Sequence, residues 1–218
     1  MVRARVTETD HGIEGTFTVA AYDEFQRHMR DRGWIETGAL LKADIRMGRA
    51  LEIGPGPGYL GLEWLKKTEG TSLVGVEISA DMIDVARRNA RDYGLGERAD
   101  YVQGSGGDLP LPEASVDAVF TAGLLHEWER PGQTFDEMWR VLRPGGLVFL
   151  SDLRRDMLLP LRWFLWLSCR PKAIRPGLLP SLRASYTPGE LRELVQGTGL
   201  ASCRISPNPL GFTLTGRR

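Results

Sequence analysis

Short apolar runs alternate with helical stretches from residue 49 to about residue 152, and this alternation constrains the fold more than any other feature of the chain. Helical segments include ADMIDVARRNARDYG, with Ser79 as its N-cap and Gly94 as its stop. Such an alternation is typical of an α/β fold with a parallel sheet. The strand-like runs are RALEI, LVGVEI, ADYVQG, VDAVFTAG and GLVFLSDL, which begin at residues 49, 73, 99, 116 and 146.

Both ends of the chain add elements to this α/β core. Thr187, Pro188 and Glu190 have the spacing of an N-cap, a first-turn proline and a capping-box partner, which predicts a helix over ELRELVQGTG. The runs ASCRIS and GFTLTG, separated by PNPL, predict an antiparallel hairpin at one sheet edge. Residues 1–48 contain two helical patterns, around AAYDEFQRHMRD and TGALLKADI, and are interpreted as an amino-terminal helical extension.

Length and composition favour one domain over residues 1–218, without a metal or disulfide framework. The chain carries 28 basic and 28 acidic residues, and this zero net charge argues against a nucleic-acid partner. Cys169 and Cys203 have no paired spacing, so neither a zinc site nor a disulfide is expected. The first twelve residues lack the features of a secretory signal, and a reducing cytoplasm is the expected location.

The strongest apolar run, MLLPLRWFLWL at residues 157–167, is too short to span a bilayer and is broken by Pro160 and Arg162. Basic residues flank it on both sides, so residues 157–175 could instead make a peripheral contact with a membrane surface. Trp163, Phe164 and Trp166 could equally be core residues. Their position within residues 153–186, a stretch with four prolines, favours a lid over the active site.

The sequence ALEIGPGPGYLG, residues 50–61, predicts a strand that turns into a helix over a glycine-rich loop, where a nucleotide can approach the backbone. Gly56, Gly58 and Gly61 satisfy G-x-G-x-x-G, with Glu77 about where a ribose-binding acid is expected, so a nicotinamide-dependent oxidoreductase is one interpretation. The overlapping pattern E-x-G-x-G-x-G adds Glu52 at the loop entrance. An acid there suits a ligand with an ammonium group and no phosphate, such as S-adenosylmethionine.

Several motifs in order resemble the class I S-adenosylmethionine-dependent methyltransferases, especially the small-molecule group that includes the quinone C-methyltransferases. These are LEIGPGPG, VEIS, VQGSGGDLPLPEASVDAVF, LLHEWERP, MWRVLRPGGLVFLSD and the terminal hairpin. The resemblance implies a Rossmann-like, seven-stranded, mostly parallel sheet with a C-terminal antiparallel hairpin and helices on both faces. It also implies methyl transfer from S-adenosylmethionine to a small apolar or aromatic acceptor, with S-adenosylhomocysteine as the product.

The resemblance assigns roles to individual residues of this sequence. Ser105 stands where the family usually has an acid that accepts a hydrogen bond from the adenine amino group. His126 would open toward the acceptor, Tyr22 would reach over the methionine end, and Asp152 could face the acceptor; each could instead be a packing or capping residue. The full set implied for cofactor binding is Glu52, Gly54, Gly56, Gly58, Tyr59, Glu77, Ile78, Met82, Ser105, Gly106, Ala122 and Leu124.

Two other functions remain open at this point. An NAD-dependent oxidoreductase would use the same loop, although no Tyr-x-x-x-Lys pair for hydride transfer is visible. A non-catalytic cofactor-binding module could use the apolar lid to engage a partner or a membrane. The identity of the small-molecule acceptor is open, and the sequence is compatible with a monomer or a homodimer.

Overall fold

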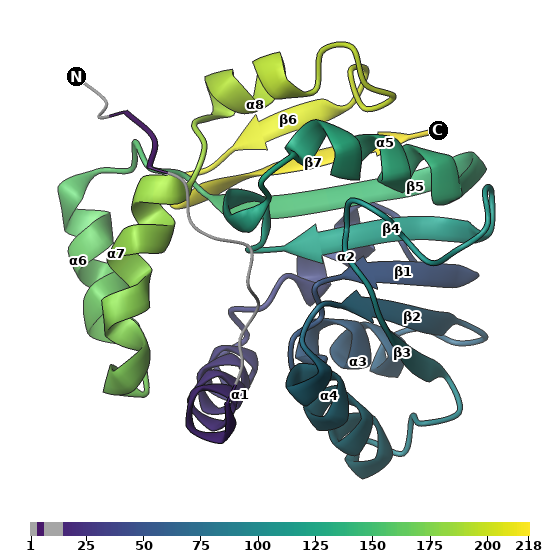
Figure 1. Cartoon of the computed structure of the whole chain (residues 1–218), viewed down its shortest axis with the longest axis horizontal. Coiled ribbons are helices and arrows are strands. Elements are labelled where there is room, and N and C mark those ends of the chain that lie inside the picture. Colours follow the sequence, from purple (N-terminus) through teal and green to yellow (C-terminus); the bar gives the residue numbers. More distant parts are fainter. Residues whose placement is uncertain (1–3, 7–14) are drawn as a thin grey trace.

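The computed structural model describes residues 4–6 and 15–218, and its centre is a seven-stranded sheet (Figure 1). Most of the first twelve residues, in which no secretory signal is expected, lie outside this part. The sheet order is β3-β2-β1-β4-β5-β7-β6. The strands are β1 (Arg49–Ile53), β2 (Ser72–Glu77), β3 (Ala99–Gln103), β4 (Val116–Ala122), β5 (Leu142–Leu153), β6 (Arg204–Pro207) and β7 (Gly211–Arg217).

The strand directions confirm the predicted fold class. The first five strands pair in parallel, whereas β7 is antiparallel to both β5 and β6. The carboxyl-terminal hairpin therefore ends the sheet at one edge, as the sequence predicts. Strand β5 begins at Leu142, four residues before the predicted GLVFLSDL run, because the RPGG turn lies within the strand rather than before it.

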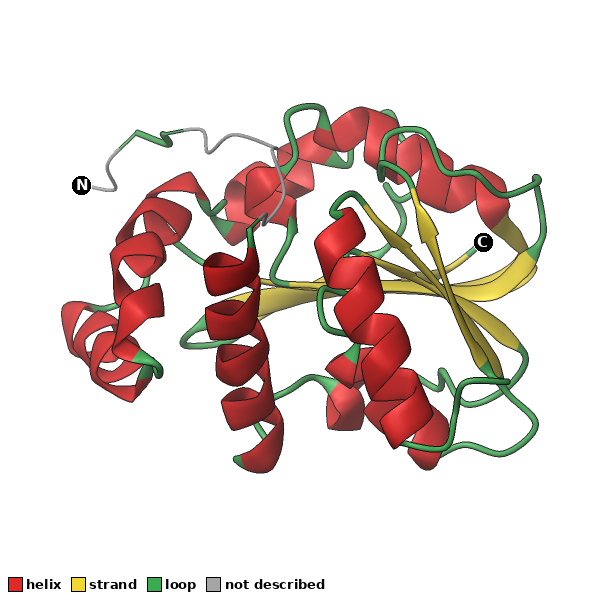
Figure 2. Cartoon of the chain, turned by 60° about the horizontal axis from the view of Figure 1, so that its bottom comes forward, coloured by secondary structure: helices red, strands yellow, loops and turns green. Residues whose placement is uncertain are grey.

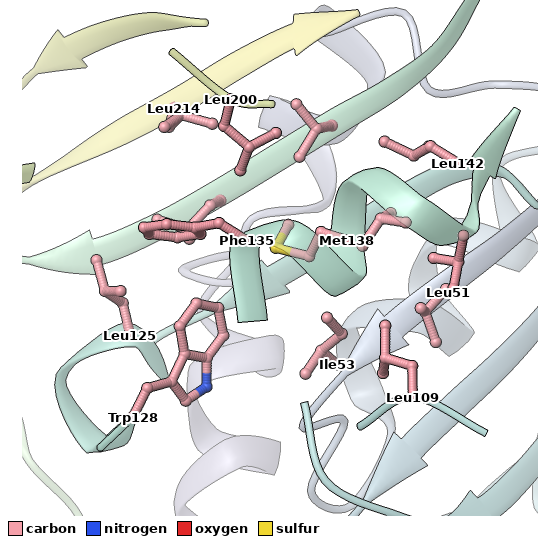
Figure 3. Close-up of a cluster of buried hydrophobic side chains, with 14 of the residues drawn as sticks. Leu51, Ile53, Leu109, Leu125, Trp128, Phe135, Met138, Leu142, Leu200 and Leu214 are labelled. Atoms are coloured by element: carbon pink, nitrogen blue, oxygen red, sulfur yellow. The ribbon is translucent and has the colours of Figure 1, made fainter. Parts of the chain in front are cut away.

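Helices cover both faces of the sheet (Figure 2). On one face, α2 (Thr37–Lys42), α3 (Tyr59–Lys66) and α4 (Ala80–Asp92) pack against side chains such as Ala50. On the other, α5 (Pro131–Val141) and α8 (Pro188–Leu194) pack against Leu51 and Ile53, with Phe135 and Met138 of α5 inside the cluster (Figure 3). The two faces follow from the alternation of side chains along β1.

Local signals place the helix ends. The Ser79 side chain accepts a hydrogen bond from the backbone N–H of Met82 and caps α4, as predicted. The capping box of Thr187 and Glu190 opens α8, as predicted, although α8 ends at Leu194. Gly94 follows α4 with φ +68°, a conformation that glycine adopts at low cost.

Three helices lie beyond the carboxyl ends of the parallel strands. These are α1 (Thr16–Asp31), α6 (Leu159–Ser168) and α7 (Arg175–Ala184), and the arrowheads of β4 and β5 point toward the side on which α6 and α7 lie (Figure 1). Two short 3-10 turns, η1 (Leu125–Glu127) and η2 (Lys172–Ile174), pack against two of these helices: α7 contacts η1, and α1 contacts η2. In the described part of the chain, every helix is too short or too polar to cross a bilayer.

Candidate functional site

The glycine loop between β1 and α3 has a backbone that only glycine adopts easily. Gly54, Gly56 and Gly58 have φ values of +65°, +51° and +84°. The backbone N–H of Gly54 donates to the carbonyl of Val76 at 2.9 Å, which ties the loop to β2. Gly58 is the N-cap of α3 and provides no side chain to cap it, so the loop passes into the helix through backbone alone.

A cleft of about 300 Å³ lies beside this loop, at the carboxyl ends of the parallel strands. It is lined by residues of α1, of the loops after β1, β2, β3 and β4, and of the first turn of α5. The cleft therefore brings together residues that are far apart in the sequence. The predicted site residues among its lining are Tyr22, Gly54, Gly56, Glu77, Ile78, Met82, Ser105, Gly106 and Leu124.

Glu77, the last residue of β2, holds its carboxylate at the cleft wall. One oxygen accepts a hydrogen bond from the backbone N–H of Gly56 at 3.0 Å, and the other accepts from the N–H of Ser79 at 3.0 Å. The residue is 7% exposed. Two backbone donors fix the direction of the carboxylate, so Glu77 presents a preorganised acceptor next to the glycine loop.

Tyr22 of α1 lines the cleft above the glycine loop. A Cβ atom added at Gly56 would lie 3.3 Å from the Tyr22 ring, so the ring lies directly over the loop. The hydroxyl group accepts a hydrogen bond from Gln26 at 2.9 Å. Burial, together with the nearby carboxylate of Glu127, raises the pKa of Tyr22 well above its usual range. The hydroxyl is therefore protonated at neutral pH and can donate a hydrogen bond, but it is a poor base.

The loop after β3 carries Ser105 and Gly106. The Ser105 hydroxyl accepts from the backbone N–H of Gly107 at 3.2 Å. Three residues further on, Asp108 also lines the cleft, so an acid is present on this loop although not at the predicted position. Several other lining residues have no role in the predicted site, although the motif LLHEWERP contains most of them: Glu127, Trp128, Glu129, Arg130, Gln133 and Thr134.

Glu52 lies elsewhere than its predicted role requires. It is absent from the cleft lining, and its carboxyl group is buried beneath α3, where it meets Gly61. One carboxyl oxygen has no hydrogen-bond partner among the described residues, and burial raises the pKa of Glu52 to about 8. A largely neutral group that faces away from the cleft does not support the argument that Glu52 meets an ammonium group. The alternation along β1 explains this: Glu52 shares its sheet face with Ala50.

Three further predicted cofactor residues, Gly58, Tyr59 and Ala122, are also outside the cleft lining. Gly58 packs beneath the loop, where a Cβ atom would lie 2.7 Å from the hydroxyl oxygen of Tyr101. The Tyr59 hydroxyl donates to Asp23 of α1 at 2.9 Å, so this side chain connects α1 to α3. Gly61, the last glycine of the dinucleotide pattern, is inside α3 against Leu73, a helix-packing position.

The structure places two predicted catalytic residues, His126 and Asp152, in direct contact. Nδ1 of His126 lies 3.0 Å from each carboxylate oxygen of Asp152, and the backbone N–H of His126 donates to the same carboxylate at 2.9 Å. Both side chains are buried, and neither lines the cleft. Nε2 of His126 lies 3.8 Å from a carboxylate oxygen of Glu127, which does line the cleft. The pair therefore lies one residue behind the cleft wall, at the ends of β4 and β5.

Comparisons with known proteins identify the family of the chain. The family model for a methyltransferase domain matches residues 51–150. A demethylmenaquinone methyltransferase of Roseiflexus sp. strain RS-1 is 30% identical over 78% of this chain and 74% of its own length. The chain belongs to the class I S-adenosylmethionine-dependent methyltransferases.

Other relatives are matched over a smaller part of their length. A fatty-acid O-methyltransferase of Mycolicibacterium smegmatis is 35% identical over 52% of this methyltransferase and 40% of its own length. The chain spans about half the length of several curated relatives that it matches. A solved structure from Methanococcus maripaludis, named as an S-adenosyl-L-methionine-dependent methyltransferase, has 21% identity and a TM-score of 0.72 over 96% of this chain and 95% of its own, which shows the shared fold.

The cleft of this chain fits S-adenosylmethionine, the cofactor of the family. The glycine loop leaves space next to Gly56 that a side chain would fill, and the carboxylate of Glu77 offers two acceptor oxygens to vicinal hydroxyl groups. The family model and the relatives do not favour the oxidoreductase interpretation or the non-catalytic one, because all of those reported are methyltransferases.

Proposed function

We propose that this chain transfers a methyl group from S-adenosylmethionine to a small apolar or aromatic acceptor. The observation that carries the proposal is the cleft in which Glu77 is fixed by two backbone N–H groups beside the glycine loop. The apolar acceptor is supported by the names of two relatives, which refer to demethylmenaquinone and to a fatty acid. It is also supported by the apolar side chains of Leu124 and Trp128 in the cleft lining.

On the cofactor side, the residues of this chain bind and orient. When bound, S-adenosylmethionine supplies an activated methyl group on a sulfonium sulfur. Glu77 would accept hydrogen bonds from the ribose hydroxyls, while Ile78 and Met82 would pack against the adenine ring. The loop of Ser105 and Gly106 would meet the edge of that ring, and Tyr22 would cover the methionine portion beside Gly56.

On the acceptor side, Leu124 and Trp128 would exclude water and align the acceptor with the methyl group. A base is needed only when the acceptor arrives protonated. His126 would then serve, because Asp152 orients its ring through Nδ1 and leaves Nε2 toward Glu127 at the cleft wall. Residues 153–186 would form a lid at this end of the sheet, where α7 contacts η1.

Calorimetry with S-adenosylmethionine and S-adenosylhomocysteine tests the cofactor site. We expect Glu77→Ala to weaken binding at least about tenfold, since two charge-assisted hydrogen bonds are lost. Glu69→Ala is the matched control, because Glu69 is exposed and lies outside the cleft. Absence of binding by the wild-type protein would contradict the proposal, and so would equal binding by both variants.

The acceptor is tested by incubating the protein with methyl-labelled cofactor and a panel of quinols, phenols and fatty acids, followed by mass spectrometry. We expect label in a member of this panel and none in polar amines or sugars that are incubated in parallel as controls. Cofactor binding without transfer to any compound would favour a non-catalytic module. If one acceptor is labelled, His126→Gln should lower kcat more than it changes KM for an acceptor that must lose a proton.

A further inference from the structure

Helix α6 presents a row of large apolar side chains to solvent. Leu159, Trp163 and Leu167 are four residues apart, so they lie along one side of the helix, and they are 67%, 63% and 60% exposed. Leu158 and Phe164 are exposed next to them. No residue of α6 is buried. We call these five side chains the α6 apolar face; their exposure excludes the alternative that Trp163 and Phe164 are core residues.

The charged residues of the segment that carries the α6 apolar face are all basic. Residues 157–189 contain five basic residues and no acidic residue. Arg170 and Lys172 are exposed immediately after α6, and the Arg175 guanidinium lies over the Trp166 ring at 4.5 Å. The acids that bound this segment, Asp156 and Glu190, form ion pairs with Arg154 and Arg155. The flanking acids therefore leave the positive charge of the segment uncompensated.

The α6 apolar face and the cleft lie at the same end of the molecule. Phe164 contacts Trp34, with ring centroids 6.2 Å apart, which connects α6 to the segment between α1 and α2. Helix α7 contacts η1, and Glu127 of that turn lines the cleft. Figure 1 shows α6 and α7 beyond the carboxyl ends of the parallel strands. A surface held against α6 would thus lie at the same end of the molecule as the cleft.

We propose that the α6 apolar face docks on the surface of a lipid bilayer that contains anionic lipids. Exposed Trp and Leu side chains beside Arg and Lys are the composition that enters the boundary between headgroups and acyl chains. Each basic residue near an anionic bilayer adds electrostatic attraction. A second copy of the chain fits less well, because a two-fold contact through this face would bring residues 157–189 of one copy, which carry five basic and no acidic side chains, against the same segment of the other. This surface goes beyond methyl transfer and does not depend on which acceptor is methylated.

Flotation of the full chain with vesicles tests the docking surface. We expect wild type to float with phosphatidylcholine vesicles that contain about one third phosphatidylglycerol, and to float far less with phosphatidylcholine alone. Trp163→Gln/Leu167→Gln should reduce the bound fraction at least about fivefold, because both anchoring side chains lose their apolar surface. Arg170→Glu/Lys172→Glu should cause a similar loss that is largest at low ionic strength.

Two matched variants control for general effects. Met47→Gln changes an apolar side chain that is 79% exposed on another part of the surface. Lys67→Glu/Arg192→Glu makes the same change in net charge as the Arg170/Lys172 variant at two other exposed positions. Both controls should float like wild type, and calorimetry with S-adenosylhomocysteine should show that every variant is folded.

Three outcomes would overturn the proposal. The first is a wild-type protein that does not float with anionic vesicles. The second is a charge control that loses as much binding as Arg170→Glu/Lys172→Glu, which would mean that net charge alone decides. The third is a dimer by analytical ultracentrifugation that Trp163→Gln/Leu167→Gln dissociates, which would assign the α6 apolar face to self-association. Vesicle flotation reports lipid contact without methyl transfer, so its failure would leave the proposed function standing.

Discussion

At the scale of single residues, Gly58 combines two constraints at the end of the glycine loop. Its φ of +84° is strained for any side chain, and a Cβ atom would lie 2.7 Å from the Tyr101 hydroxyl oxygen. We expect Gly58→Ala to lower the free energy of unfolding by about 2 kcal/mol or more, because the left-handed backbone alone costs an L-residue about 1–2 kcal/mol. Urea denaturation measures the change.

The contact with Tyr101 provides an internal check on this prediction. The Tyr101 hydroxyl is buried without a hydrogen-bond partner in the described part of the chain, so Tyr101→Phe should cost little by itself. In the Gly58→Ala background it should recover part of the lost stability, since it removes the closest atom. Gly132→Ala in α5 is the control, because a Cβ atom there meets nothing within 4 Å. Additive effects of the Gly58 and Tyr101 substitutions would contradict a direct clash.

The site residues that the sequence could identify are those fixed by local backbone geometry. Gly54, Gly56 and Glu77 reach the cleft because a strand end and a glycine turn determine their position. Glu52 does not, since its place in the motif does not show which face of β1 carries the side chain. The contact between His126 and Asp152 joins the turn η1 to β5 through tertiary structure, and no spacing within the sequence encodes its 3.0 Å distance.

At the scale of elements, Asp23 anchors α1 over the cleft. Its carboxylate accepts from Tyr59 of α3 at 2.9 Å and from Asn89 of α4 at 3.3 Å. Asn89 also donates to the carbonyl of Pro57 in the glycine loop at 2.8 Å. We expect Asp23→Ala to lower the free energy of unfolding by about 2 kcal/mol, because buried donors lose their acceptor. It should also weaken S-adenosylhomocysteine binding several-fold, because α1 carries Tyr22.

Glu24→Gln is the matched control for the anchoring of α1. Glu24 is the next residue on α1 but is exposed, so its substitution should leave both stability and binding unchanged. Hydrogen exchange adds a direct reading of the element: amides of α1 should lose protection in Asp23→Ala while those of α5 keep it. A uniform loss of protection in α1 and α5 alike would mean that Asp23 supports the whole fold and does not anchor α1 specifically.

Elements with strong periodicity or explicit caps can be predicted from the sequence. The surroundings of elements that depend on tertiary contacts cannot be predicted in the same way. Helix α4 has its N-cap at Ser79, and the capping box opens α8, so both starts could be predicted from the sequence. The spacing of Leu159, Trp163 and Leu167 predicts an apolar helix face but not its burial, because such a face can either pack against the core or be exposed to solvent. Only the packing of neighbouring elements distinguishes these two states.

At the scale of the whole molecule, the position of the cleft follows from the strand order. The chain builds outward from β1 through β2 to β3 and then returns to β4 on the other side of β1. Loops that leave β1 and β4 therefore diverge, and a crevice opens between them at the carboxyl ends of the strands. The alternating pattern predicted the parallel sheet, and the hairpin signal near the carboxyl end predicted the antiparallel pairing of β6 with β7.

The pH dependence of stability is a property of the whole molecule in which two carboxyl groups act in opposite directions. Burial raises the pKa of Glu52 from 4.5 to about 8. Between these values the folded state holds more protons than the unfolded state, so the free energy of unfolding falls as pH rises. The hydrogen bonds from Arg155 lower the pKa of Glu190 to about 2, so stability from this group is present above pH 4.5 and is lost as pH falls toward 2.

We therefore expect the free energy of unfolding to be highest near pH 5. It should fall by on the order of a few kcal/mol toward pH 8, because Glu52 ionises. The loss toward pH 2 should be smaller, about 1 kcal/mol, because Glu190 is partly exposed and its ion pair is screened. Urea midpoints between pH 3 and pH 8.5 at constant ionic strength measure the profile. Glu52→Gln keeps the shape of the neutral carboxyl group and cannot ionise, so it should flatten the fall above pH 5 and be more stable than wild type at pH 8. Parallel profiles for the two proteins would show that Glu52 is ionised in the folded state.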